Sequence, residues 1–235
     1  MRARRFSFAN DCVSCTLRRE GNFCNLPAET LATFSDIGYL SVFPSDVTLL
    51  VEGEVPRGVF VLCSGRAKLS MRMEDGRTVI LNVAGGRQLL GMSAVVSERP
   101  SAVTVTTVEY CQVKFIARSD FLSLLARNSS VALGCAVALS RDIGKAFDTL
   151  YELLLARSSA GKLARLLLSL AGNEAGNHEL QIGSDFTHEE MAQMIGSSRE
   201  TVTRLLGDMK RRELIRQEGT TLVIPDRIAL QAIAA

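Results

Sequence analysis

The chain lacks an apolar run long enough to cross a membrane, and its N-terminus lacks the apolar segment of a secretory signal. Its first ten residues carry three arginines, Arg2, Arg4 and Arg5, and no continuous apolar segment. These absences predict a cytoplasmic protein, in which thiols stay reduced. There, a group of cysteines is more often a metal site than a set of disulfides.

An excess of charge is also lacking, since 27 Lys and Arg face 25 Asp and Glu and leave a net charge of +2. Nucleic-acid binding therefore needs a local argument rather than a global one. The chain has no G-x-S-x-G, G-x-G-x-x-G or P-loop motif. Its two histidines, His178 and His188, both lie late in the chain, so no nucleophile–base pair is visible. We expect no enzymatic activity.

What the chain does have is enough apolar residues, 47% of 235, to build a core in one large domain or two smaller ones. From about Leu40 to Phe115, short apolar runs alternate with turn residues. The runs at 49–51, 59–63 and 79–83 are each followed by a glycine within three residues. Short strands with glycine turns at this spacing predict an all-β sandwich or barrel.

Beyond Asp120 the apolar residues recur at helical spacing. The steps are four, four, three and four residues, close to a coiled-coil seam, through Leu139, Ile143, Phe147, Leu150 and Leu154. We interpret this stripe as a dimer interface; a helix that merely covers the β domain is the alternative. The resulting domain prediction is an N-terminal arm at 1–26, a β domain at 27–118, a dimerisation helix region at 119–158 and a C-terminal domain at 159–235.

The C-terminal domain carries the signature of two short helices joined by a glycine turn. Thr187 and Glu190 fit a capping box, Gly196 can end that helix, and Ser197 to Glu200 offers a second box. This is the pattern of a helix-turn-helix DNA reader. The segment 213–224 reads as a hairpin wing beside it.

The second helix of this pair has residues suited to base reading on its outer side. Its apolar positions, Val202, Leu205, Leu206 and Met209, predict the buried face. Outward near its start lie Ser198, Arg199, Glu200, Thr203 and Arg204. Arg can donate two bonds to guanine and Glu can accept from cytosine. Residues 197–216 hold six cationic against three acidic side chains, so the surface is locally basic, and the later cations fit phosphate contacts.

Three cysteines near the N-terminus, Cys12, Cys15 and Cys24, form the other informative feature. Thiolates are soft ligands, which favour iron–sulfur clusters or zinc over hard cations. Together with a DNA reader they predict a switch that converts redox chemistry into transcription.

These features resemble the CRP/FNR family of bacterial transcription regulators over nearly the whole chain. Residues 198–204 look like that family's recognition helix, and 52–54 with 59–69 look like its β-roll. The resemblance implies an α+β protein: an N-terminal β-roll of the cyclic-nucleotide-binding, jelly-roll type, a long dimerisation helix and a C-terminal winged helix-turn-helix. It also implies a homodimer on double-stranded DNA, a two-fold symmetric site with TGA-containing half-sites, and RNA polymerase as a partner.

The resemblance also bears on the effector. Cyclic-nucleotide members carry a Gly-Glu-Leu stretch and an Arg-Ser pair, where this chain has Gln88 and Pro100 at the acidic and phosphate-binding positions. A bound phosphate would lack its charged partner there, although Arg99 lies one residue away. The stretch 91–111 looks instead like the iron–sulfur members of the FNR type. That likeness implies a [4Fe-4S] cluster on Cys12, Cys15, Cys24 and Cys111.

Several alternatives stay open at the thiols. The gap of eight residues between Cys15 and Cys24 is wider than in the best-known FNR pattern. Cys63, in an apolar strand, could substitute as the fourth ligand, while Cys135 reads as a small buried residue. A structural zinc site and a thiol–disulfide switch are the competing interpretations of the same cysteines.

Overall fold

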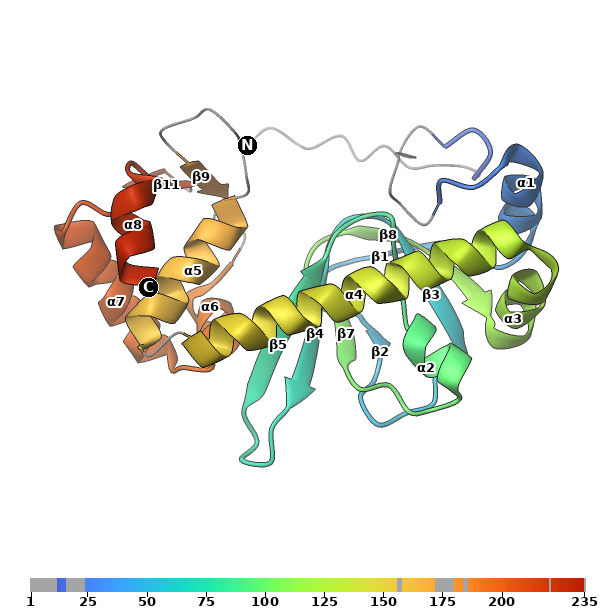
Figure 1. Ribbon diagram of the computed structural model, residues 1–235, viewed down its shortest axis with the longest axis horizontal. Helices are drawn as coiled ribbons and strands as arrows, with labels where there is room; N and C mark the ends of the chain where they lie inside the picture. Colours follow the sequence, from blue (N-terminus) through green and yellow to red (C-terminus); the bar gives the residue numbers. More distant parts are fainter. Residues whose placement is uncertain are drawn as a thin grey trace. The chain divides into compact units, whose positions relative to one another are not determined.

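The computed structural model describes residues 12–15, 24–155, 158–171, 180–183, 186–219 and 221–234; of residues 145 and 148–155 only the backbone is described. These residues form two compact units (Figure 1). One holds the chain up to Gly144 apart from residues 72–80, and the other holds 72–80 and the chain from Lys145 onward.

The first unit is a roll of two four-stranded sheets. One sheet has the order β1-β8-β3-β6, formed by Tyr39–Phe43, Cys111–Ala117, Gly58–Ser64 and Gln88–Leu90. The other has the order β2-β7-β4-β5, formed by Thr48–Leu50, Thr104–Thr107, Ala67–Arg72 and Thr78–Ala84. The strand prediction for residues 40–115 is thus confirmed as a jelly-roll arrangement.

Alternation of side chains along β3 and β8 gives the first sheet two buried faces. The face toward the second sheet forms what we call the inter-sheet core, made of Leu50, Leu62, Ala67, Ala84, Leu90, Val105, Cys111 and Val113. The opposite face forms the helix-side core, made of Leu26, Leu31, Phe34, Val59, Val61, Leu89, Met92, Val95, Ile116, Phe121, Leu124, Val131 and Cys135.

Four helices supply the other half of the helix-side core: α1 (Ala28–Asp36), α2 (Met92–Ser97), α3 (Arg118–Arg127) and the long α4 (Ser129–Leu155). Val131 and Cys135 anchor the first turns of α4 in this core. Among the described residues no single helix is long and apolar enough to cross a membrane; α3 and Ser129–Gly144 meet that test only as a pair bent by 111°.

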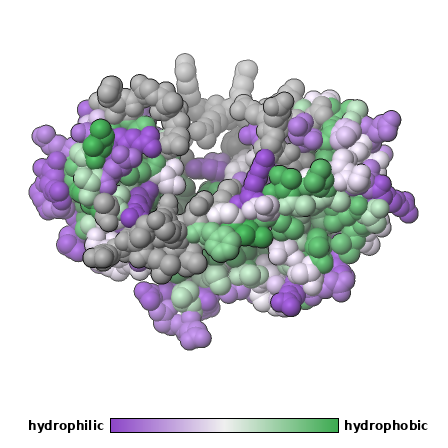
Figure 2. All heavy atoms as spheres, in the orientation of Figure 1, coloured by the Kyte–Doolittle hydropathy of each residue, from purple (hydrophilic) through white to green (hydrophobic). Residues whose placement is uncertain are grey.

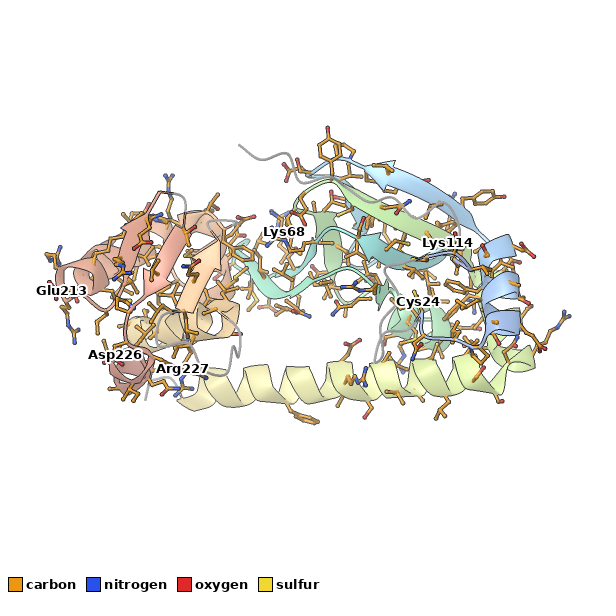
Figure 3. The ribbon with its side chains drawn as sticks, turned by 90° about the horizontal axis from the view of Figure 1, so that it is seen from above. Cys24, Lys68, Lys114, Glu213, Asp226 and Arg227 are labelled. Atoms are coloured by element: carbon orange, nitrogen blue, oxygen red, sulfur yellow. The ribbon has the colours of Figure 1, made fainter. Side chains whose placement is uncertain are left out.

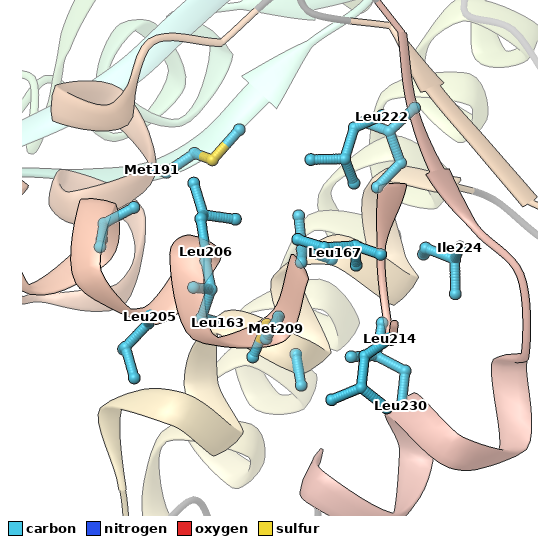
Figure 4. Close-up of a cluster of buried hydrophobic side chains, with 14 of the residues drawn as sticks. Leu163, Leu167, Met191, Leu205, Leu206, Met209, Leu214, Leu222, Ile224 and Leu230 are labelled. Atoms are coloured by element: carbon cyan, nitrogen blue, oxygen red, sulfur yellow. The ribbon is translucent and has the colours of Figure 1, made fainter. Parts of the chain in front are cut away.

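The second unit packs helices against a three-stranded sheet of order β10-β11-β9. Its strands are Arg216–Glu218, Thr221–Ile224 and Leu180–Gly183, and its helices are α5 (Ser159–Ala171), α6 (His188–Ile195), α7 (Arg199–Arg211) and α8 (Arg227–Ala234). Figure 4 shows their common core, in which Leu163 and Leu167 of α5 face Leu206 and Met209 of α7. This is the predicted winged helix.

The predicted domain limits can be compared with these elements. For the β-roll at 27–118, α1 begins at Ala28 and β8 ends at Ala117. For the helix region at 119–158, α3 and α4 extend from Arg118 to Leu155. For the C-terminal domain at 159, α5 begins at Ser159. Most of the arm at 1–26 lies outside the described residues.

Candidate DNA-reading helix and thiol group

The helix-turn-helix is built by local caps. The Thr187 hydroxyl accepts from the Glu190 backbone N–H at 3.1 Å, and the Glu190 carboxylate accepts from the Thr187 N–H at 3.0 Å, so the predicted capping box is confirmed. Gly196 ends α6 in the left-handed conformation, with φ of 64°. These caps fix the start and the end of the first helix.

The cap of the second helix differs from the prediction by one residue. Ser198, not Ser197, caps α7, and its hydroxyl accepts from the Thr201 backbone N–H at 3.2 Å. The expected box between Ser197 and Glu200 therefore does not form. The cause is the length of the turn: Ser197 is used to close α6, since its N–H bonds to the Ala192 carbonyl.

The base-reading candidates share one exposed face of α7. Val202, Leu205, Leu206 and Met209 are buried, as predicted, and the opposite side is open. A hollow on that side is lined by Arg199, Glu200, Thr203 and Arg204. A helix with a buried apolar face and a polar outer face near its N-terminus fits the geometry of a recognition helix in the major groove.

The charged side chains of α7 differ in the hydrogen bonds and ion pairs that they form. Hydrogen bonds from its own backbone N–H and from the Ser198 hydroxyl lower the pKa of Glu200, which keeps the carboxylate ionised and able to accept. Within the described part of the chain, no ion pair holds Arg199 or Arg204. By contrast, Arg211 and Arg212 pair with Asp208 at 3.1 and 3.7 Å. The two arginines nearest the helix start are therefore the ones free to meet a base.

One residue on this surface escaped the sequence analysis. The Nδ1 atom of His188, in the first turn of α6, lies 2.9 Å from the Thr203 hydroxyl. The sequence analysis noted His188 only as one of the two histidines late in the chain. The 15-residue separation from Thr203 left no pattern that could have linked the two.

The predicted dimer stripe lies partly open on α4. Ile143 and Phe147 are 57% and 66% exposed, whereas Leu139 packs partly against the helix-side core. Leu133 and Val137, which the sequence analysis missed, extend the exposed apolar face toward the helix start. Figure 2 shows hydrophobic side chains at the surface on the side where α4 runs in Figure 1. Leu150 and Leu154 lie outside the residues whose side chains are described.

The N-terminal thiols lie against the roll. Cys12 and Cys24 pack on the helix-side core, and so does Cys63 of β3. The Cys12 backbone N–H donates to the Ser35 hydroxyl of α1 at 3.2 Å, which attaches the arm to that helix. Cys15 is near enough for its charge to act on the thiols of Cys24 and Cys63.

Burial dominates the acidity of these thiols. It raises the pKa of Cys24 to about 12, with further increases from Cys63, Cys12 and Cys15 and an opposing effect of Arg87. Mutual repulsion of this kind indicates that the four sulfur atoms are neighbours. Among the described residues, however, no group of three or more His, Cys, Asp or Glu side chains is placed so that it could hold a metal ion.

Cys111 is not in this group. It is fully buried in the inter-sheet core, on the other side of the sheet, and its Sγ donates to the Arg66 carbonyl at 3.1 Å. The structure thus brings together Cys12, Cys15 and Cys24 with Cys63, and leaves the predicted fourth ligand apart from them.

Residues 99–101 stand at the position of the Arg-Ser pair of cyclic-nucleotide members, and their serine forms its hydrogen bonds within the protein. Ser101 is buried, its hydroxyl donates to the Val103 carbonyl at 2.7 Å, and its N–H donates to the Glu54 carbonyl at 2.8 Å. Pro100 and Arg99 are exposed beside it. The serine hydroxyl is already satisfied by the backbone.

A β-roll of the cyclic-nucleotide-binding type joined to a winged helix defines a two-domain transcription regulator. Residues 40–128 match the cyclic nucleotide-binding domain, and residues 161–233 match the Crp-like helix-turn-helix domain. With both domains present in this order, the chain belongs to the CRP/FNR family of transcription regulators.

Relatives and solved structures agree with this family. The chain is 29% identical over 221 residues to the CRP-like cAMP-activated global transcriptional regulator of Mycobacterium tuberculosis, covering 92% of this chain and 98% of that one. Its fold is similar to the c-di-GMP responsive regulator CLP of Xanthomonas campestris, with a TM-score of 0.73, 20% identity and coverage of 84% and 99%. FixK2 of Bradyrhizobium japonicum gives a TM-score of 0.70 at 18% identity, with coverage of 85% and 98%.

Proposed function

We propose that this regulator senses oxygen or redox state through a [4Fe-4S] cluster held by its N-terminal thiols, and that as a dimer it reads a two-fold symmetric site with TGA-containing half-sites. The observation that carries the proposal is the packing of Cys12 and Cys24 with the β-strand cysteine Cys63 on one face of the roll, with Cys15 close enough for its charge to act on Cys24.

The donor set fits such a cluster. Four thiolates are what a cubane requires, and thiolates are soft donors that do not favour Mg²⁺ or Ca²⁺. The cationic side chains of Arg87 and Lys114 act on these thiols and would offset the negative charge of a thiolate-bound cluster. When bound, the cluster would supply a redox-active centre that reacts with oxygen.

The helix-side core also supports a structural connection between the thiols and helix α4. The thiols Cys12, Cys24 and Cys63 pack on a core that also holds Val131 and Cys135 of α4. A change in how the arm packs therefore acts on the base of the helix whose exposed face carries Leu133, Val137, Ile143 and Phe147. An apolar face of this kind on a helix is covered by a second copy in a dimer.

On the DNA side, support comes from the exposed face of α7. Arg199 and Arg204 offer bidentate donors to guanine, and ionised Glu200 offers an acceptor to cytosine. A half-site containing TGA presents both a guanine and, on the opposite strand, a cytosine.

A cyclic nucleotide is the second candidate effector, because a curated relative is described as cAMP-activated and residues 40–128 match the cyclic nucleotide-binding domain. Two features weigh against it. Gln88 and Pro100 replace the acidic and the phosphate-binding residue, and the Ser101 hydroxyl already donates to a backbone carbonyl.

The test is anaerobic purification of the full chain, with iron and acid-labile sulfide counted and the visible spectrum recorded before and after air. We expect about four irons per chain and a brown colour that bleaches in air. Stoichiometric zinc or a metal-free protein would refute the cluster. If in that case cAMP strengthens binding to the symmetric duplex, the cyclic-nucleotide candidate is correct.

A further inference from the structure

The two faces of the sheet β1-β8-β3-β6 separate the β-strand cysteines. Along β3, Val59 and Val61 enter the helix-side core while Leu62 enters the inter-sheet core. Cys63 is two residues beyond Val61, so the same alternation places it on the face of Val59 and Val61. Cys63 therefore packs on the side where Cys12 and Cys24 lie.

Cys111 is enclosed from the other direction. Glycine is required at position 65, where φ is +87° and a Cβ would lie 2.7 Å from the Cys111 Sγ. The Arg66 carbonyl accepts from that Sγ at 3.1 Å. The turn between β3 and β4 thus covers the Cys111 thiol. The arm cysteines lie on the other face of the sheet, so they could reach this thiol only if the turn opened.

Lys114 adds a buried positive charge on the Cys63 side of the sheet. It is only 4% exposed, and its Nζ donates to the Ser35 carbonyl at 2.9 Å and lies 5.9 Å from the Phe34 ring centroid. No ion pair with a carboxylate is found for it across the described ranges. An ammonium group buried without a charged partner is costly, so a negative group is expected nearby.

As thiolates bound to a cluster, the neighbouring cysteines would supply that negative charge. Ser35 bonds both to the Cys12 N–H and to the Lys114 ammonium. Lys114 pairs directly with Val61 across β8 and β3, and Cys63 is the next residue of β3 on the same face. In Figure 3, Cys24 and Lys114 both lie at the end of the roll that carries α1.

We propose that Cys63, in place of Cys111, is the fourth thiolate of the cluster site and that Lys114 is its buried counter-cation. This proposal rests on the cluster function proposed above. It assigns Cys111 a purely packing role in the inter-sheet core.

The ligand assignment is tested with Cys63→Ser and the matched variant Cys111→Ser in the full chain, both purified without oxygen. We expect Cys63→Ser to lose most of its iron and its visible absorption, and Cys111→Ser to keep both. The reverse result overturns the assignment while leaving the cluster function standing. A wild-type protein without iron and sulfide overturns both.

A second measurement covers the case in which either variant folds poorly. Wild-type protein is alkylated in its native state before and after iron is removed by a chelator, and each cysteine is quantified by mass spectrometry. We expect iron removal to increase labelling of Cys12, Cys15, Cys24 and Cys63 and to leave Cys111 unchanged. Iron-dependent labelling of Cys111 with none at Cys63 would overturn the assignment.

The counter-cation is tested with Lys114→Met, which keeps the apolar stem, and Lys114→Arg, which keeps the charge. Loss of the charge disfavours addition of an electron, so the midpoint potential of the cluster should fall in Lys114→Met and stay near wild type in Lys114→Arg. Lys68→Met, on β4, is the control for a change in net charge. A potential in Lys114→Met equal to that of wild type and of Lys68→Met would refute the role.

Discussion

The two units of this regulator differ in how far along the chain their decisive contacts reach. In the second unit, the winged helix that we call the reader, the caps that start α6 and α7 join residues three apart. These pairs are Thr187 with Glu190 and Ser198 with Thr201. In the roll, the contacts around the thiols join Cys12 to Ser35 and Ser35 to Lys114, which is 79 residues away. The winged helix is specified locally, whereas the group of thiols is assembled only once the whole roll has formed.

A matched pair of glycines gives the sharpest test of this difference. Gly65 in the roll and Gly196 in the reader both have positive φ, but a Cβ at Gly65 meets Cys111 and Tyr110 while one at Gly196 meets nothing within 4 Å. Gly196→Ala should cost about 1–2 kcal/mol of its unit's stability. Gly65→Ala adds overpacking and should cost about 3 kcal/mol or more in total.

Hydrogen exchange followed by mass spectrometry assigns each loss of stability to its unit. Equal losses for the two alanine variants would mean that the turn over Cys111 is looser than these contacts imply.

Removal of Arg204, a candidate base-reading residue, should affect DNA binding without affecting stability. Arg204→Ala deletes an exposed guanidinium that forms no ion pair with the described residues, and should weaken binding to a TGA-containing symmetric duplex by about 1–3 kcal/mol. Arg212→Ala, at the end of α7, is the control and should weaken all duplexes alike. Fluorescence anisotropy at fixed salt measures both. Equal losses for matched and altered half-sites would place Arg204 on the phosphates.

The reactivity of the cysteine thiols reports on the first unit alone, because all six cysteines precede residue 136. Burial raises the pKa of Cys135 to about 12, so below pH 9 the folded unit keeps a neutral thiol, and this contribution to stability is lost as the pH rises toward 12. At pH 8, Cys135 should react with iodoacetamide on the order of tenfold or more slowly than in the unfolded chain. Fast labelling of Cys135 in folded protein would contradict the packing of α4 on the helix-side core.

The caps should produce the smallest effects. Thr187→Ala and Ser198→Ala should each destabilise the reader by about 1 kcal/mol, because each leaves a helix N-terminus with an unsatisfied N–H. Ser197→Ala is the neighbouring control and should be nearly neutral. Thermal unfolding of the reader, followed by hydrogen exchange, distinguishes them. A larger loss at Ser197 than at Ser198 would show that the second cap is one residue earlier than described.

The same contrast explains what the sequence could predict. The capping box at Thr187, the buried face of α7 and the Gly196 turn follow from spacings within one or two helical turns, and all are present. The strands of the roll also follow from local alternation. The face on which Cys63 lies follows in the same way, because Cys63 is two residues from Val61. Local alternation does not show that Cys12 and Cys24 pack on that face, because these contacts join residues far apart in the chain.

The predicted dimer helix, α4, is predictable only in part. The periodicity located α4, but a stripe in the sequence cannot tell the face that packs on the roll from the face left open. Leu139 was assigned to the seam although it packs partly on the helix-side core, while Leu133 and Val137 were missed. Lys114 could not be recognised at all, because a lysine in a strand is ordinarily exposed.

The helix-side core carries the arm cysteines on one part of its surface and the first turns of α4 on another. Under the proposed function, the binding of the cluster by the thiols and the binding of the second subunit both depend on the packing of this one set of side chains. Thermodynamic linkage makes such a relation reciprocal. Whatever factor the occupied thiol site contributes to the dimer constant, dimer formation contributes the same factor to ligand retention, so the cluster should be lost more readily from a monomer than from a dimer.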